Sequence, residues 1–188
     1  MNGLLSCKLA TSRLLLRPFQ PADAAALSHI AGDRAIADTM ISIPYPYPRE
    51  QAIASIETQS SELRGGRAFH FAMTLLSGQF LIGSISLRDI EREHSQAELS
   101  FWVGKPWWGR GYAKEAGAAV VGFGFDDVDL NRIYAHHMIR NPAAGAVMRA
   151  LGMRREGLLR ERVRKWGVFE DVALCAVLRR DWEACRAQ

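Results

Sequence analysis

The stretch Trp107-Trp-Gly-Arg-Gly-Tyr-Ala-Lys-Glu115 decides how this chain folds. An alternating, β-rich run, Ala97–Val103, precedes it, and a proline-free run rich in Ala, Val and Phe follows it to Phe125. This order predicts a strand, a glycine turn and then a helix. Gly109 and Gly111 permit tight backbone turns and place no side chain over the neighbouring N–H groups.

A strand, a short glycine loop and a helix start together suggest a seat for a phosphate or pyrophosphate. The first four N–H groups of a helix have no partner within it, and the helix dipole favours a negative charge there. An ordinary glycine turn explains a lone Gly-x-Gly pair about as well. Two known phosphate loops are excluded, because Lys114 precedes Glu115 instead of Ser or Thr, and because Lys114 occupies the place of a third glycine.

The six residues from Trp108 to Ala113 resemble the loop of the GNAT N-acetyltransferases, Gln/Arg-x-x-Gly-x-Gly/Ala, with Trp108 departing at the first position. The version Trp-Gly-x-Gly-Tyr-Ala is similar to that of the RimJ/RimL-like branch, the ribosomal-protein alanine N-acetyltransferases and their relatives. The opening Thr-x-Arg-Leu-x-Leu-Arg-x-Phe at Thr11–Phe19 and the segment Asn141–Met153 match the same branch. The resemblance extends from Thr11 to Trp182.

The order of elements predicts an α/β (α+β) protein with a mixed sheet and helices on both faces. The resemblance implies the GNAT fold, in which a central, mostly antiparallel sheet has about seven strands. Periodicity and turn residues predict strands at residues 13–19, 67–76, 80–89, 97–103, 131–139, 153–164 and 168–178. Helices are predicted at residues 21–30, 48–63, 113–125 and 142–151.

Length and composition indicate one globular domain. The 188 residues, with 48% hydrophobic and 23% charged side chains, suit a single core. We expect that domain over residues 11–182, with 1–10 and 183–188 as terminal extensions. No apolar run reaches the length of a membrane span, and no secretory signal is recognisable, so we expect a cytoplasmic protein. Three widely spaced cysteines fit reduced thiols, and their spacing predicts no metal site.

The resemblance implies acetyl-CoA as the cofactor and assigns residues to it. Main-chain groups of the loop would hold the pyrophosphate, with added charge from Arg110 and Lys114. The end of the preceding strand would lie beside the pantetheine arm, and Asn141 would contact that arm, although a plain helix cap explains Asn141 nearly as well. Ala144 stands where the family often has serine. The predicted cofactor residues are Phe101, Trp102, Val103, Trp108, Gly109, Arg110, Gly111, Tyr112, Ala113, Lys114, Asn141 and Ala144.

Glu98 and Ser100 are the predicted catalytic residues. The family often has a glutamate at the position of Glu98, and apolar neighbours would raise the pKa of an inward carboxyl so that it accepts a proton through water. A solvent-facing glutamate is an equal alternative. Ser100 shares the face of Glu98 by strand alternation. His136 and His137 point to opposite faces and cannot easily share one ion, so they are assigned a structural role, as is His70.

The proline-rich segment Ile43-Pro-Tyr-Pro-Tyr-Pro48 predicts an extended loop. Tyr45 and Tyr47 on it are predicted to contact the acceptor, although a linker between helices also explains the prolines. The predicted reaction is direct attack of a primary amine, a protein N-terminus or a small amine, on acetyl-CoA in a ternary complex. The alternatives are a non-catalytic acyl-CoA sensor, since no tyrosine acid is matched, and a ribosome- or RNA-binding protein using the basic segment Arg154–Lys165. A homodimer is the further partner considered, while a membrane and a metal are not expected.

Overall fold

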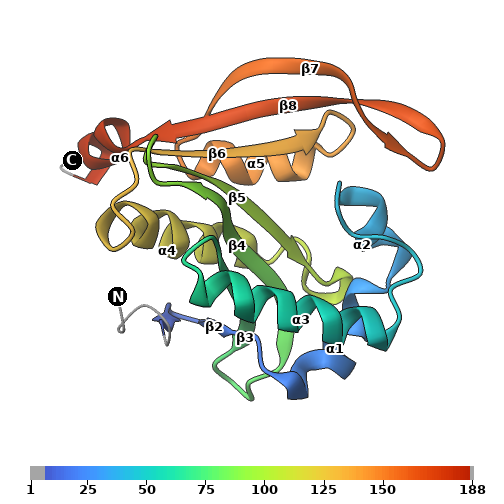
Figure 1. The fold of residues 1–188 in the computed structure, drawn as a ribbon. Coiled ribbons are helices and arrows are strands. Elements are labelled where there is room, and N and C mark those ends of the chain that lie inside the picture. The colour runs from blue at the N-terminus through green and yellow to red at the C-terminus, as the bar shows by residue number, and fades with distance from the viewer. Residues whose placement is uncertain (1–6, 187–188) are drawn as a thin grey trace.

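The centre of the computed structural model, which describes residues 7–186, is an open sheet of eight strands (Figure 1). The strands lie in the order β1-β2-β3-β4-β5-β6-β8-β7, and only β5 and β6 pair in parallel. The mixed, mostly antiparallel sheet is therefore confirmed. The strands are β1 (Leu9–Ala10), β2 (Leu14–Pro18), β3 (Phe69–Leu75), β4 (Leu81–Glu91), β5 (Gln96–Val103), β6 (Arg132–Met138), β7 (Arg154–Lys165) and β8 (Val168–Leu178).

The strand that the sequence did not predict is β1, which pairs with β2 at Leu9↔Leu16 and Ala10↔Leu15. Two residues are too few to show an alternating pattern, so only pairing reveals this edge strand. It lies in the segment assigned above to an N-terminal extension. The helices are α1 (Ala24–Ala31), α2 (Arg34–Thr39), α3 (Arg49–Arg64), α4 (Tyr112–Asp126), α5 (Pro142–Ala150) and α6 (Arg179–Arg186), with short 3-10 turns at Pro21–Asp23 and Lys105–Trp107.

Helices cover both faces of the sheet, as predicted (Figure 1). On β3, Phe71 and Met73 pack into the core that contains α4, whereas Ala72 between them packs with α1 and α3 on the other face. The glycines of α4 allow a close approach to neighbouring elements. A methyl group at Gly124 would lie 2.7 Å from Ile133 of β6, which explains why this helix tolerates glycine in its interior.

Strands β5 and β6 diverge, and this divergence opens the sheet where the site lies. Their parallel pairing covers only Gln96↔Arg132, Ala97↔Ile133 and Glu98↔Tyr134. From Leu99 onward β5 stays paired to β4 alone, so its other edge offers free backbone groups. Figure 1 shows β6, β8 and β7 leaving the plane of β4 and β5 on the side toward α2.

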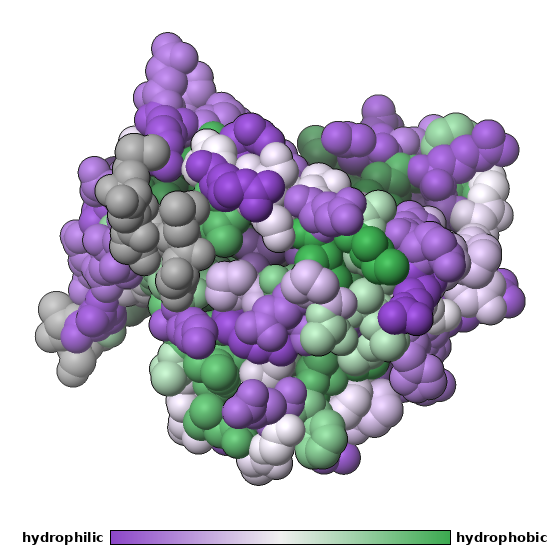
Figure 2. All heavy atoms as spheres, turned by 60° about the horizontal axis from the view of Figure 1, so that its bottom comes forward, coloured by the Kyte–Doolittle hydropathy of each residue, from purple (hydrophilic) through white to green (hydrophobic). Residues whose placement is uncertain are grey.

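The outer surface carries apolar and hydrophilic residues side by side. Figure 2 brings forward the face at the bottom of Figure 1, where apolar side chains form patches separated by hydrophilic ones. Exposed apolar residues include Leu76 and Phe80 at the turn between β3 and β4. Within residues 7–186, no helix is both long enough and apolar enough to cross a membrane.

Candidate active site

The turn between β5 and α4 presents consecutive unpaired N–H groups. Gly109 and Gly111 adopt left-handed conformations, with φ of 72° and 78°, and Gly111 is the residue before the first turn of α4. The first main-chain hydrogen bond of the helix runs from Glu115 N to Gly111 O at 3.0 Å. No acceptor within residues 7–186 takes the N–H groups of residues 109–114. Free N–H donors at the start of a helix are the groups that an anion-binding site requires.

Glu115 joins this turn to the link between β1 and β2. Its carboxylate accepts hydrogen bonds from Thr11 Oγ1 at 2.6 Å, Ser12 Oγ at 2.9 Å and the main-chain N–H of Arg13 at 2.8 Å. Arg13 in turn donates to Arg110 O at 3.0 Å, and its guanidinium lies 4.4 Å from the centre of the Tyr112 ring. Burial opposes ionisation of Glu115, but these hydrogen bonds outweigh it and lower its pKa to about 2.

A cavity of about 450 Å³, called here the loop cavity, lies between β5, the turn, β6 and α5. The exposed residue Arg110 is the one predicted cofactor residue that does not line it. The predicted residues that do line it are Phe101, Trp102, Val103, Trp108, Gly109, Gly111, Tyr112, Ala113, Lys114, Asn141 and Ala144, together with Glu98 and Ser100.

Trp108 and Asn141 already have partners in the protein. The indole N–H of Trp108 donates to Val103 O, so the residue that departs from the family pattern ties the turn to the end of β5. Asn141 Oδ1 accepts from Ala144 N at 3.2 Å and caps α5, while its Nδ2 donates to Thr39 O at 3.4 Å. The helix-cap role of Asn141 is thus present in the structure, and its contact with a cofactor stays a prediction.

Glu98 lies between two cationic or polar partners at the point where β5 and β6 separate. Its carboxylate is 3.0 Å from Arg88 Nη2 and 3.2 Å from His136 Nδ1. Burial raises the pKa of Glu98, but the hydrogen bond from His136 and the charge of Arg88 outweigh this and hold the pKa below its usual value. The raised pKa expected from apolar neighbours is therefore wrong, because residues on adjacent strands supply the polar partners.

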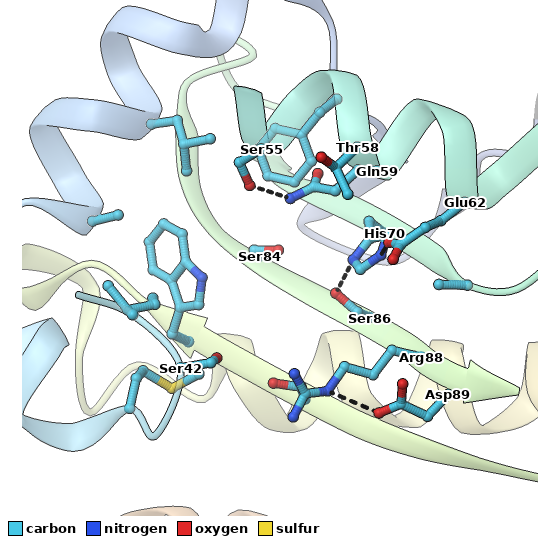
Figure 3. A pocket seen from close by; sticks show the side chains of 18 of the residues that line it. Ser42, Ser55, Thr58, Gln59, Glu62, His70, Ser84, Ser86, Arg88 and Asp89 are labelled. Carbon is cyan, nitrogen blue, oxygen red and sulfur yellow. Dashed lines mark hydrogen bonds and ion pairs between the residues drawn. The ribbon is translucent and has the colours of Figure 1, made fainter. Parts of the chain in front are cut away.

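A second cavity of about 830 Å³, called here the polar cavity, lies between α3, β4 and the segment after α2. Figure 3 shows its serine, threonine and carboxylate side chains. Tyr47 lines this cavity. Tyr45 lines neither cavity; it is half-exposed, and its ring packs edge-on against Trp166 with 6.2 Å between ring centres.

The two cavities meet beside β5. The residues that line both are Met40, Ser42, Arg88, Ser100 and Trp102. Ser100 thus lies at the contact between a cavity that carries free N–H donors and one rich in polar side chains. A transfer reaction needs this arrangement, since two substrates can enter separately and bring their reacting atoms together.

Comparison with known proteins identifies the family. The model of the family described as Acetyltransferase (GNAT) domain matches residues 13–154. The chain belongs to this family. YnaD of Bacillus subtilis, an uncharacterized N-acetyltransferase, is 31% identical over 93% of this chain and 98% of its own length. The uS5-alanine N-acetyltransferase of Escherichia coli is 27% identical over 62% of this chain and 61% of its own length.

Solved structures agree with the assignment. RimJ of Mycobacterium smegmatis, in complex with CoA-disulfide, superimposes with a TM-score of 0.83 at 26% identity, covering 94% of this chain and 88% of that chain. The protein is an acetyl-CoA-dependent N-acetyltransferase of the RimJ/RimL-like branch, and it transfers an acetyl group to an amine. A non-catalytic sensor or an RNA-binding protein is not favoured. Within residues 7–186, no group of three or more His, Cys, Asp or Glu side chains is placed to hold a metal ion.

The acetyltransferase has polar site residues that sequence reasoning missed. His136 was assigned a structural role, yet it lines the loop cavity and contacts Glu98. Arg88 and His70 likewise line the polar cavity. These residues lie on three strands, and only the pairing of distant strands brings them to the cavities, so no local sequence signal marks them. Arg88 pairs with Glu98, and His70 pairs with Ser86.

Proposed function

We propose that the acetyltransferase moves the acetyl group directly to a primary amine, a protein N-terminus or a small amine, while both substrates are bound. The observation that supports this is the meeting of the two cavities at Ser100. The N–H groups of residues 109–114 and the charge of Lys114 would hold the pyrophosphate. Residues 101–103, Asn141 and Ala144 would flank the pantetheine arm. The amine would enter through the polar cavity, past Tyr47.

The chemistry of the step is a single displacement at the thioester. The lone pair of the neutral amine attacks the carbonyl carbon, so that a C–N bond forms and the C–S bond breaks. The nitrogen loses one proton to a base, and CoA leaves as a thiolate that takes a proton from water. Main-chain groups on the open edge of β5, beyond Glu98, would stabilise the carbonyl oxygen.

The Glu98–His136 pair is the proposed proton acceptor. His136 Nδ1 lies 3.2 Å from the carboxylate, which cannot donate, so this nitrogen carries the proton. His136 Nε2 is then the basic nitrogen, and it has no partner among residues 7–186. The lowered pKa of Glu98 keeps its carboxylate charged, and that charge stabilises the imidazolium formed when Nε2 takes the amine proton. Ser100, on the same strand as Glu98, would orient the amine.

The test measures CoA release with a panel of amines and peptide N-termini. We expect His136→Gln and Glu98→Gln each to lower kcat by about 10²-fold or more, with the Kd for acetyl-CoA changed by less than about twofold. His29→Gln, on an exposed face of α1, is the matched control and keeps full activity. An inactive E98Q beside an active H136Q assigns the base to the carboxylate alone. Full activity of both variants overturns the proposed pair.

The order of substrate binding is tested by initial rates at varied acetyl-CoA and amine. Direct attack gives intersecting double-reciprocal lines, and parallel lines would indicate a covalent acyl-enzyme instead. The described cysteines favour direct attack, because Cys7, Cys175 and Cys185 line neither cavity. Burial also raises the pKa of Cys175, which makes its thiol a weaker nucleophile.

Three sequence predictions belong with this proposal. They are a single domain over residues 11–182, a cytoplasmic location and a homodimer. Analytical ultracentrifugation tests the homodimer, since the measured mass of a dimer is twice the 20.9 kDa of one chain. Limited proteolysis tests the domain boundary, because a folded unit resists cleavage within its own limits.

A further inference from the structure

Three polar side chains form a row across one wall of the polar cavity (Figure 3). Glu62 of α3 lies 2.7 Å from His70 Nε2, and His70 Nδ1 lies 2.9 Å from Ser86 Oγ. His70 lies on β3 and Ser86 on β4, where the two residues are direct cross-strand partners. All three line the polar cavity. The row therefore joins the helix to the strand that borders the reaction centre.

The row fixes the polarity of the Ser86 hydroxyl. Burial lowers the pKa of His70, against the opposing effect of Glu62, so its ring is neutral near pH 7. The carboxylate of Glu62 can only accept, so His70 Nε2 carries the proton and Nδ1 is an acceptor. Ser86 must then donate its hydroxyl proton to Nδ1. The lone pairs of Ser86 Oγ remain, and no other donor within residues 7–186 contacts them.

A second unsatisfied acceptor lines the same cavity. Gln59 Nε2 donates to Ser55 Oγ at 3.1 Å, while Gln59 Oε1 is buried and has no hydrogen-bond partner in the described part of the chain. A buried acceptor without a partner is costly, and the cost is recovered when a ligand supplies a donor. Gln59 and Ser86 together make this wall a receptor for hydrogen-bond donors.

Strand register places this receptor one strand away from the reacting atoms. Ser86 of β4 is the cross-strand partner of Ser100 of β5, one of the residues that line both cavities. Neighbouring strands are roughly 4.8 Å apart. A group bound at Ser86 is therefore separated from an amine at Ser100 by about the length of a three-carbon chain.

The wall suits a small molecule better than a peptide backbone. The main chains of β4 and β5 pair with each other from Gly83↔Val103 to Arg88↔Glu98, so this wall offers no free strand edge to a peptide. Its recognition groups are side chains, and a cavity of about 830 Å³ lies in the range that suits small ligands.

We propose that the polar cavity selects small primary amines that carry a second hydrogen-bond donor, a hydroxyl or an ammonium group, about three carbons from the reacting nitrogen. Ser86 Oγ receives this donor, and the Glu62–His70 pair holds Ser86 in its accepting orientation. Gln59 Oε1 is a second, unpartnered acceptor on a residue that lines the same cavity. The inference rests on the proposed function, because it takes the polar cavity as the entry of the amine.

The test compares three primary amines of equal length that differ in the terminal group. They are 3-aminopropan-1-ol, propane-1,3-diamine and butylamine, whose termini are hydroxyl, ammonium and methyl. Binding to the CoA-loaded protein is measured by ligand-observed NMR titration, which does not depend on turnover. We expect one or both donor-bearing amines to bind about tenfold more tightly than butylamine, the effect of one good hydrogen bond to a buried acceptor. Whichever of 3-aminopropan-1-ol and propane-1,3-diamine binds more tightly identifies the preferred donor as a hydroxyl or an ammonium group.

Variants separate recognition from folding. Ser86→Ala removes the receiving oxygen and should reduce the preference to less than about twofold without changing butylamine binding. Glu62→Gln removes the carboxylate that keeps the proton on His70 Nε2, so either ring nitrogen can carry it. This variant should reduce the preference for the donor-bearing amines about threefold. Ser60→Ala is the matched control, because the Ser60 hydroxyl bonds within α3 to Ile56 O at 2.9 Å and lines neither cavity.

Three results would overturn the inference. They are equal binding of all three amines to the wild-type protein, an equal effect of S60A and S86A, and a peptide N-terminus that binds more tightly than all three and is insensitive to S86A. CoA release is scored separately. Selective binding without CoA release contradicts the proposed function and supports this inference. CoA release without selective binding supports the proposed function and contradicts this inference.

Discussion

Glu115 is a single carboxylate that couples the link between β1 and β2 to the turn before α4. Its oxygens accept from Thr11, Ser12 and Arg13, and Arg13 reaches on to the carbonyl of Arg110. The carboxylate also lies in the first turn of α4, where the helix dipole favours a negative charge. One side chain therefore supports both the edge of the sheet and the geometry of the turn.

The pH dependence of stability follows from the pKa of Glu115. The folded-state pKa of about 2 lies below the ordinary value of 4.5, so the carboxylate contributes stability above pH 4.5. That contribution is lost as the pH falls from about 4.5 toward 2. We expect Glu115→Gln to lower the free energy of unfolding by roughly 1–3 kcal/mol at pH 7, which lowers the Tm by several degrees. Calorimetry at pH 7 and pH 3 should show a smaller difference from wild type at pH 3.

Glu57→Gln is the control for this prediction. Glu57 is an exposed helical glutamate on α3, and its replacement should shift the Tm by less than about one degree at either pH. A Tm difference between E115Q and wild type that is the same at pH 3 and pH 7 would show that charge is not the source of the stability.

Glu98 shows which part of a site a sequence can predict. Its position on a strand before the glycine turn is readable, and the structure brings it to the loop cavity. Its partners are not readable, because Arg88 and His136 lie 10 and 38 residues away and meet it only through sheet pairing. The pKa was therefore predicted in the wrong direction from the apolar neighbours along its own strand.

The turn between β5 and α4 is the element that the sequence predicted best. Strand, glycine turn and helix all lie where the pattern placed them, because glycine spacing and periodicity are local signals. Elements without such signals were missed. Helix α2 has six residues, begins at an Asp33 cap that accepts from Ala35 N, and is too short for a periodic stripe. The divergence of β5 and β6 depends on how two distant segments pair, which no local pattern records.

The left-handed conformation of Gly111 gives a prediction for the whole turn. A methyl group there would lie 3.6 Å from Arg13 Nη2, an ordinary contact, so the penalty of Gly111→Ala comes from a φ of 78° and not from crowding. A left-handed non-glycine residue costs roughly 1–2 kcal/mol. If the backbone relaxes to relieve this strain, the N–H groups of residues 109–114 no longer point toward a common anion. We expect the Kd for acetyl-CoA to rise about tenfold, as measured by titration calorimetry.

Gly167→Ala supplies a matched control for this change. Gly167 has a φ of 84°, and a methyl group there would meet nothing within 4 Å, but it lies in the turn between β7 and β8. The backbone strain is comparable, so both variants should lose similar stability. An unchanged Kd in G111A, or an equal rise in both variants, would argue against an anion seat at this turn.

At the scale of the whole molecule, the β7–β8 hairpin supports the segment that borders both cavities. Lys165 Nζ donates to Ile43 O at 2.9 Å, and the side chain is buried. Asp38 of α2 accepts from Trp166 Nε1 at 2.6 Å and from Arg140 at 2.9 Å. Residues 40–47, which follow Asp38 and contain Ile43, include Met40 and Ser42 at the cavity junction and Tyr47 in the polar cavity. The C-terminal hairpin thus positions a wall of the proposed acceptor entrance from more than 100 residues away.

Replacing Lys165 by Met tests this long-range support. The variant keeps an apolar stem of similar length but leaves the carbonyl of Ile43 without its donor, which costs roughly 1–3 kcal/mol locally. We expect amide hydrogen exchange in residues 40–48 to accelerate about tenfold or more, and the KM for the amine to rise severalfold. The Kd for acetyl-CoA should change by less than about twofold, because the turn proposed to hold the pyrophosphate is held separately by the hydrogen bonds of Glu115. Arg160→Met, an exposed change on the same strand, should alter none of these quantities. Unchanged exchange in K165M, or equal losses of amine and acetyl-CoA binding, would show that the hairpin does not position the entrance separately from the cofactor site.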